Sequence, residues 1–76
     1  MGTVRNCYDK AVQNIREVGS GKLMSGQALE PSTGVFYAHC WVDRDGSIVD
    51  PMGWSEHKGW NGNDAVELHL PKKEER

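Results

Sequence analysis

The sequence predicts an α+β domain in which one N-terminal helix packs on an antiparallel sheet of three or four strands. Apolar residues in the first eighteen positions recur at spacings of three and four, which is the period of an amphipathic helix. The later segments are short and rich in β-branched and aromatic residues, and Asp45-Gly46 joins two of them as a hairpin turn. A chain of 76 residues has the size of one domain. We expect that domain over residues 1–71, with a charged tail at 72–76.

The helix is expected to end at Val18, because Gly19 suits the left-handed residue that follows many helices. Its start is open between two N-caps. Thr3 would cap a helix that begins at residue 4, and Asn6 would cap one that begins at Cys7. The choice decides whether Cys7 lies at the positive end of the helix or one turn inside. The apolar stripe consists of Val4, Cys7, Tyr8, Ala11, Val12, Ile15 and Val18.

Four segments are expected to form strands. Residues 22–29 are short and mixed, which is typical of an edge strand, whereas residues 35–43 are apolar on both faces, which indicates a central or doubly covered strand. Residues 47–50 return from the hairpin turn, and residues 65–70 alternate apolar and polar side chains. Residues 52–64 are expected to form a Gly-rich loop that carries two tryptophans. Short connections favour a meander order.

The hairpin turn fixes a register that brings three side chains to one face. If Arg44 pairs with Ser47, then Trp41 faces Asp50, and Asp50 lies diagonal to His39, within side-chain reach. We expect the helix to pack across this same face, which also carries apolar residues.

Composition excludes several classes of function. Nine Lys and Arg against 11 Asp and Glu give a net charge of −2, which argues against a nucleic-acid-binding protein. No stretch approaches the roughly 20 apolar residues of a membrane span, and the first ten residues lack the apolar core of a secretory signal. Two cysteines make no disulfide framework, so we expect reduced thiols and a cytoplasmic protein without a cofactor.

Two metal-site patterns are present in part, and neither is complete. Segment 43–48 resembles a piece of an EF-hand loop, but Trp41 and Met52 would then occupy positions that must bind calcium. Cysteines and histidines could supply zinc ligands, but His39 and Cys40 are adjacent in a strand and point to opposite faces. We therefore expect no metal.

A cysteine, a histidine and an aspartate form the most specific pattern. Cys7 lies near a helix start, His39 in a strong strand, and Asp50 at the end of the next strand. A helix start and a nearby imidazole both lower a thiol's pKa, and a carboxylate beside the imidazole fixes its orientation. These are the parts of an activated thiolate, so the three residues are candidates for catalysis.

The segment around the hairpin resembles a known family. His39-Cys40-Trp41-Val42 followed by Gly46-Ser47-Ile48-Val49-Asp50-Pro51 resembles the H-x-W-V … G-x-I-x-D-P signature of papain-like cysteine proteins of the transglutaminase-like branch. The resemblance is continuous over about residues 35–51 and implies one helix on an antiparallel sheet. It would make Cys7 the nucleophile, His39 the base and Asp50 the orienting residue of a hydrolase or acyl-transfer protein. Few residues precede Cys7, so Gln27 or backbone amides near Cys7 would donate to the oxyanion.

A non-catalytic binding module is the alternative. Trp54, His57 and Trp60 lie in the polar loop 52–64 and, with Trp41, are candidates for a recognition surface, although tryptophans in so small a chain also suit the core. Such a module could be a phage or mobile-element protein that blocks a host protein. Either function implies a protein or peptide as substrate or partner. A homodimer is expected if both faces of the sheet are apolar.

Overall fold

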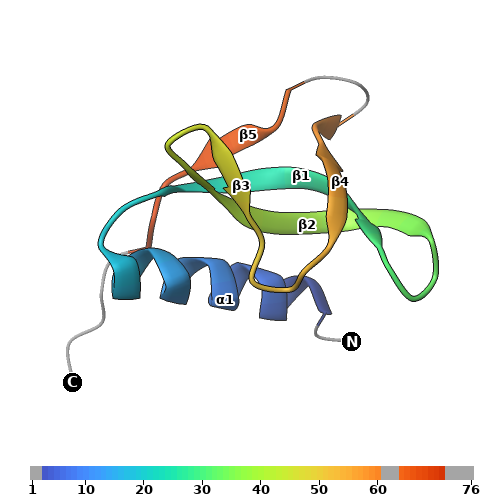
Figure 1. The fold of residues 1–76 in the computed structure, drawn as a ribbon, viewed down its shortest axis with the longest axis horizontal. Helices are drawn as coiled ribbons and strands as arrows, with labels where there is room; N and C mark the ends of the chain where they lie inside the picture. Colours follow the sequence, from blue (N-terminus) through green and yellow to red (C-terminus); the bar gives the residue numbers. More distant parts are fainter. Residues whose placement is uncertain (1–2, 61–63, 72–76) are drawn as a thin grey trace.

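A computed structural model describes residues 3–60 and 64–71, which form one helix and five strands (Figure 1). The elements are α1 (Thr3–Val18), β1 (Lys22–Glu30), β2 (Val35–Arg44), β3 (Ser47–Val49), β4 (Ser55–Lys58) and β5 (Val66–Leu68). The predicted α+β class is confirmed. The predicted tail at 72–76 lies outside the described residues. The helix already includes residue 3, so Asn6 is not its cap, and Cys7 lies in the second turn rather than at the helix mouth.

The sheet does not follow the predicted meander. Its order is β3-β2-β1-β4, and β5 also pairs with β1. β1 is therefore a central strand and not the expected edge, because the chain after β3 crosses to the far side of β1. β4 lies within the segment predicted as a loop. Its sequence, Ser-Glu-His-Lys, has no apolar alternation, so only its pairing with β1 shows that it is a strand.

The hairpin register is confirmed, but the helix covers the other face of the sheet. Val42 pairs with Val49, and Arg44 pairs with Ser47. The prediction that α1 packs across the His39 face is wrong, because Cys40 and Val42 of β2 point toward the helix instead. The buried core between helix and sheet consists of Cys7, Ala11, Val12, Ile15, Leu23, Cys40 and Val42.

The chain between β3 and β4 covers the His39 face. Asp50 follows β3 at one edge of the β1–β2 pair, and His57 lies on β4 at the other edge, yet their side chains meet at 2.6 Å. The sheet is therefore curled. Gly26 permits this curl: a Cβ atom there would collide with the carbonyl oxygen of Lys58 and lie 2.8 Å from the Trp41 ring.

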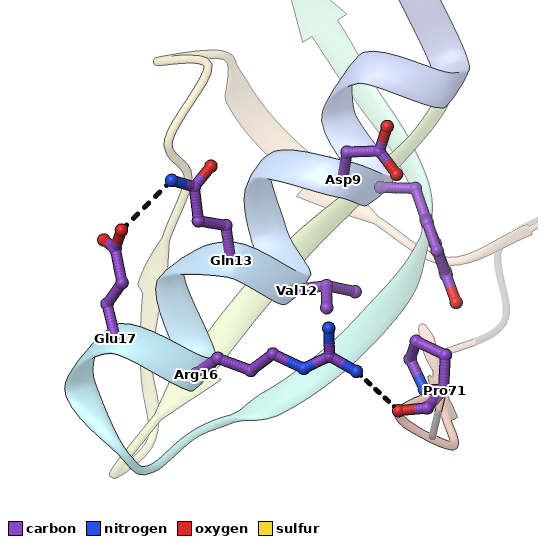
Figure 2. Close-up of a pocket in the computed structure, with 7 residues that line it drawn as sticks. Asp9, Val12, Gln13, Arg16, Glu17 and Pro71 are labelled. Carbon is purple, nitrogen blue, oxygen red and sulfur yellow. Dashed lines mark hydrogen bonds between the residues drawn. The ribbon is translucent and has the colours of Figure 1, made fainter. Parts of the chain in front are cut away.

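The C-terminal end of the described chain returns to the helix. β5 pairs with residues 23–25 of β1, and the Arg16 guanidinium donates a 2.7 Å hydrogen bond to the carbonyl oxygen of Pro71 (Figure 2). On the neighbouring turn, the Gln13 amide donates to Glu17 at 3.0 Å. Among the described residues, no helix has the length and apolar character that crossing a membrane requires.

Candidate active site

The sulfur of Cys7 lies against the outer edge of β2. The Cys7 residue is 1% exposed, and the backbone N–H of Cys40 donates to its Sγ atom at 3.3 Å. β3 pairs with β2 only at residues 42–44, so the outward-pointing amide of Cys40 lies beyond the end of that pairing. A cysteine from the apolar stripe of α1 thereby replaces a strand as the partner of this amide.

His39 and Asp50 form a buried ionisable pair on the face of β2 that points away from the helix. Nε2 of His39 lies 2.8 Å from Oδ2 of Asp50, and the two side chains are 0% and 4% exposed. The other carboxylate oxygen, Oδ1, accepts a 2.8 Å hydrogen bond from the backbone N–H of Met52. Both oxygens of Asp50 are thus held, and the carboxylate fixes the orientation of the imidazole, as the diagonal register predicts.

His57 joins His39 and Asp50, and these three residues together with Cys7 are called the ionisable cluster. The sequence did not indicate that His57 belongs to it. Its Nε2 atom lies 2.6 Å from the Oδ2 atom that also contacts His39. A carboxylate oxygen only accepts, so each of the two Nε2 atoms carries a hydrogen and donates to it. The His57 ring also packs edge-on against Trp41, with ring centres 4.8 Å apart. No signal in the sequence joins His57 to Asp50, because the contact depends on β4 pairing with β1.

The tryptophans of the predicted recognition surface lie in different environments. Trp54 stacks on the His39 ring with centres 4.1 Å apart and planes 7° apart, and it is 8% exposed. Trp41 is also buried, whereas Trp60 is 37% exposed. The prediction that Trp54 and Trp41 offer a binding surface is therefore wrong: both cover the imidazoles. Gln27, the predicted oxyanion donor, is half-buried on β1, paired with Ala38 and Lys58.

Contacts within the cluster shift the pKa values of three groups. A hydrogen bond from the Cys40 thiol lowers the pKa of Cys7 to about 5 against the opposing effect of burial, and the His39 ring lowers it further. Burial opposes the charge on His39, but the hydrogen bond to Asp50 and the interaction with Cys7 outweigh it and raise the pKa of His39 to about 9. Burial likewise acts to raise the pKa of Asp50, yet hydrogen bonds from His39 and His57 bring it below 3.8.

At neutral pH the cluster therefore holds a thiolate, an imidazolium and a carboxylate. The hydrogen bond to Cys7 and burial both raise the pKa of Cys40, so Cys40 remains a neutral thiol and Cys7 is the group that ionises. Nε2 of His39 is bound to Asp50, so Nδ1 is the ring nitrogen that Asp50 leaves available. Nδ1 is buried and makes no well-formed hydrogen bond within residues 3–60 and 64–71. Cys7 nevertheless interacts with this ring, since each group shifts the pKa of the other.

No protein-family model, no curated protein and no solved structure matches this chain. The resemblance to papain-like proteins stays a prediction that rests on the residues around the hairpin.

Proposed function

We propose that this protein is a small cysteine-dependent hydrolase or acyl-transfer enzyme. Cys7 is the nucleophile, His39 the general acid and base, and Asp50 the residue that orients His39. The observation that carries the proposal is the buried pair of His39 and Asp50, whose Nε2 and Oδ2 atoms are 2.8 Å apart, and it is supported by the pKa of Cys7, which the His39 ring helps to lower. A thiolate stabilised by a neighbouring imidazolium is the reactive form of a cysteine nucleophile.

The proposed reaction is acyl transfer from an amide or thioester. The thiolate of Cys7 attacks the carbonyl carbon, and the electron pair of the C=O bond moves to oxygen. When that pair returns, the bond to the leaving amine or thiol breaks, and His39 gives the leaving atom its proton through Nδ1. Water or an acceptor amine then attacks the carbonyl carbon of the acyl-cysteine and gives its proton to Nδ1 of His39. The carbon–sulfur bond breaks, and its electron pair returns to Cys7, which becomes a thiolate again. Asp50 stabilises the imidazolium form throughout.

Substrate access requires a local movement, because Cys7 is 1% exposed. Met52 lies in the turn that connects β3 to β4 and packs against the core cluster that contains Cys7. Displacement of this turn is the proposed route for a protein or peptide substrate. A reducing cytoplasm, where both thiols stay reduced, is the proposed location. Association as a homodimer is also part of the proposal.

The pH dependence of thiol alkylation tests this function. Iodoacetamide is added across the pH range, and mass spectrometry separates modification of Cys7 from that of Cys40. We expect the rate at Cys7 to rise with a midpoint near 5, far below the ordinary thiol value of 9.0. His39→Gln should move the midpoint upward, because the imidazolium is lost. A midpoint near 9.0 in both proteins would contradict the proposal. Turnover is then sought with peptide anilides and thioesters, with Cys7→Ala as the inactive control.

The closed site favours a second candidate, a binding module without catalysis. A nucleophile with 1% exposure is not presented to a substrate in this structure, whereas Tyr37 and Trp60 are 46% and 37% exposed. Exposed aromatic side chains are suited to anchor a protein partner, which could be a host factor blocked by a phage or mobile-element protein. If Cys7→Ala leaves the biological effect of the protein intact and Trp60→Ala abolishes it, this candidate replaces the enzyme.

A further inference from the structure

We infer that His39, Asp50 and His57 form a binding site for a divalent transition-metal ion, with Zn²⁺, Co²⁺ and Fe²⁺ as the chemical class. Their ligand atoms, two Nε2 and one carboxylate oxygen, all lie within 4.8 Å of one another. This inference goes beyond the proposed function and does not depend on turnover. It gives His39 a second state, in which a metal ion replaces the proton shared with Asp50.

The donor set selects the class of metal. Two imidazole nitrogens and one carboxylate oxygen suit borderline ions of the first transition row, which bind imidazole well. Ca²⁺ and Mg²⁺ require a shell made mainly of oxygen atoms, which this site does not provide. Three protein ligands also leave at least one coordination position for water or another ligand.

Only small side-chain shifts would convert the hydrogen-bonded cluster into a metal site. Oδ2 of Asp50 lies 2.8 Å from Nε2 of His39 and 2.6 Å from Nε2 of His57. With metal–ligand bonds of about 2.1 Å, neighbouring ligand atoms lie about 3.0–3.4 Å apart. Each of these two nitrogen–oxygen separations must therefore grow by less than about 1 Å, and the two Nε2 atoms, which lie within 4.8 Å of each other, must reach the same range. The ion would take the place of the two hydrogens that now point at Oδ2.

Contacts outside the ligand atoms already have the form of supporting contacts in metal sites. A metal-bound histidine commonly donates its other ring N–H to an acceptor, and a bound carboxylate is itself hydrogen-bonded. Oδ1 of Asp50 accepts the Met52 amide at 2.8 Å. Nδ1 of His39 is buried and makes no well-formed hydrogen bond among the described residues. With metal on Nε2, this nitrogen would carry the hydrogen of a neutral His39.

Charge also favours a divalent ion. The ligand set contains one buried carboxylate, which carries a negative charge that a cation can neutralise. Each histidine must bind the ion through a nitrogen without a hydrogen, so binding displaces both Nε2 hydrogens, and any ring that was protonated on both nitrogens releases a proton. Of the three ligands, His57 also lines an open depression of about 400 Å³ together with Asp43 and Asp64, whose carboxylates attract cations, and with Lys58, which opposes them.

Metal binding has a consequence for the proposed chemistry. With an ion on Nε2, a neutral His39 keeps a hydrogen only on Nδ1, and loss of that hydrogen would leave an imidazolate anion, so His39 could no longer act as an effective general acid. The metal-bound protein is therefore expected to be an inactive, stabilised form.

The test uses the folded Cys7→Ala variant, which keeps all three ligands and removes the adjacent thiol. Co²⁺ and Zn²⁺ are titrated against a chromophoric chelator at neutral pH. We expect one ion per chain, Co²⁺ absorption without sulfur charge-transfer bands, and release of protons. His57→Gln in the same background should weaken binding by at least about 10-fold. The matched control is His69→Gln, which changes an exposed histidine just beyond β5 and should leave binding unchanged.

Several outcomes would overturn the inference. The first is that Cys7→Ala binds Co²⁺ no more tightly than the double variant Cys7→Ala, His57→Gln. The second is that His69→Gln weakens Co²⁺ binding as much as His57→Gln does. If His57→Gln does not fold, ring ¹H–¹⁵N spectra of the unsubstituted protein provide the test. Zn²⁺ should shift the signals of His39 and His57 but not that of His69. A shift of the His69 signal without shifts of His39 and His57 would contradict the metal site. A negative result for metal binding can be told apart from a negative result for the proposed function. The alkylation midpoint of Cys7 is measured with EDTA present, so it does not depend on any metal ion.

Discussion

Replacement of Asp50 by asparagine should lower the pKa of His39 and the stability of the fold together. Asparagine keeps the size of the side chain and an oxygen for the Met52 amide, but it removes the negative charge 2.8 Å from Nε2 of His39. The pKa of His39 should then fall from about 9 toward its ordinary value of 6.5, because only the contribution of Cys7 remains to oppose burial. The whole difference corresponds to about 3 kcal/mol, and Asp50 supplies the largest of the effects that raise the pKa.

The sign of the pH effect follows from linkage. A folded-state pKa above the unfolded value adds stability that is fully present below 6.5 and is lost as pH rises through about 9. The depressed pKa of Cys7 acts with the opposite sign, because it adds stability as pH rises from about 5 toward 9.0. In the unsubstituted protein the two effects offset each other between 6.5 and 9, so urea unfolding should show little pH dependence there. Asp50→Asn removes the His39 contribution, so its stability should rise with pH over this range. Histidine ring ¹H–¹⁵N spectra give the midpoint directly. Asp45→Asn, an exposed hairpin position, is the control. If Asp50→Asn leaves the His39 midpoint near 9, Asp50 is not the group that holds the imidazolium.

Three further predictions use the same measurements. Cys40→Ala should raise the alkylation midpoint of Cys7 above about 5, because the Cys40 thiol makes the largest contribution to lowering it; an unchanged midpoint would contradict that cause. Gly26→Ala should cost about 3 kcal/mol by overpacking, whereas Gly34→Ala, where the added Cβ meets no atom within 4 Å, should cost about 1 kcal/mol for its positive φ; equal losses in urea unfolding would refute the collision. The pKa of Asp50 is depressed, so the stability it adds should be lost as pH falls below 3.8, and Asp50→Asn should show no such loss.

Local patterns predicted a large part of the fold. The spacing of apolar residues predicted the helix and its end at Val18 but left its start open between residues 4 and 7, and the turn at Asp45-Gly46 gave the pairing of Val42 with Val49 that the structure contains. That pairing also placed Asp50 within reach of His39, and their atoms lie 2.8 Å apart. Each of these inferences depends on residues that are close in the chain, where backbone geometry leaves few alternatives.

The predictions from sequence that proved wrong concern contacts between segments that are distant along the chain. β2 is apolar on both faces, so its sequence could not show which face the helix covers. The polar strand β4 has no periodic signal, and its place beside β1 depends on how the chain crosses the sheet after Pro51. The expectation of an exposed Trp54 failed for the same reason, because that crossing lays its ring on His39.

Local patterns in the chain are enough to specify one helix, the hairpin with its register, and the residue types needed for an activated thiol. Long-range packing is needed to bring Cys7 to the amide of Cys40 at the edge of β2, and to bring His57 and His39 to a single carboxylate oxygen. The difference lies in the distance over which each effect acts. Turn chemistry and apolar periodicity act over a few neighbouring residues, whereas these contacts require a curled sheet that brings together segments far apart along the chain.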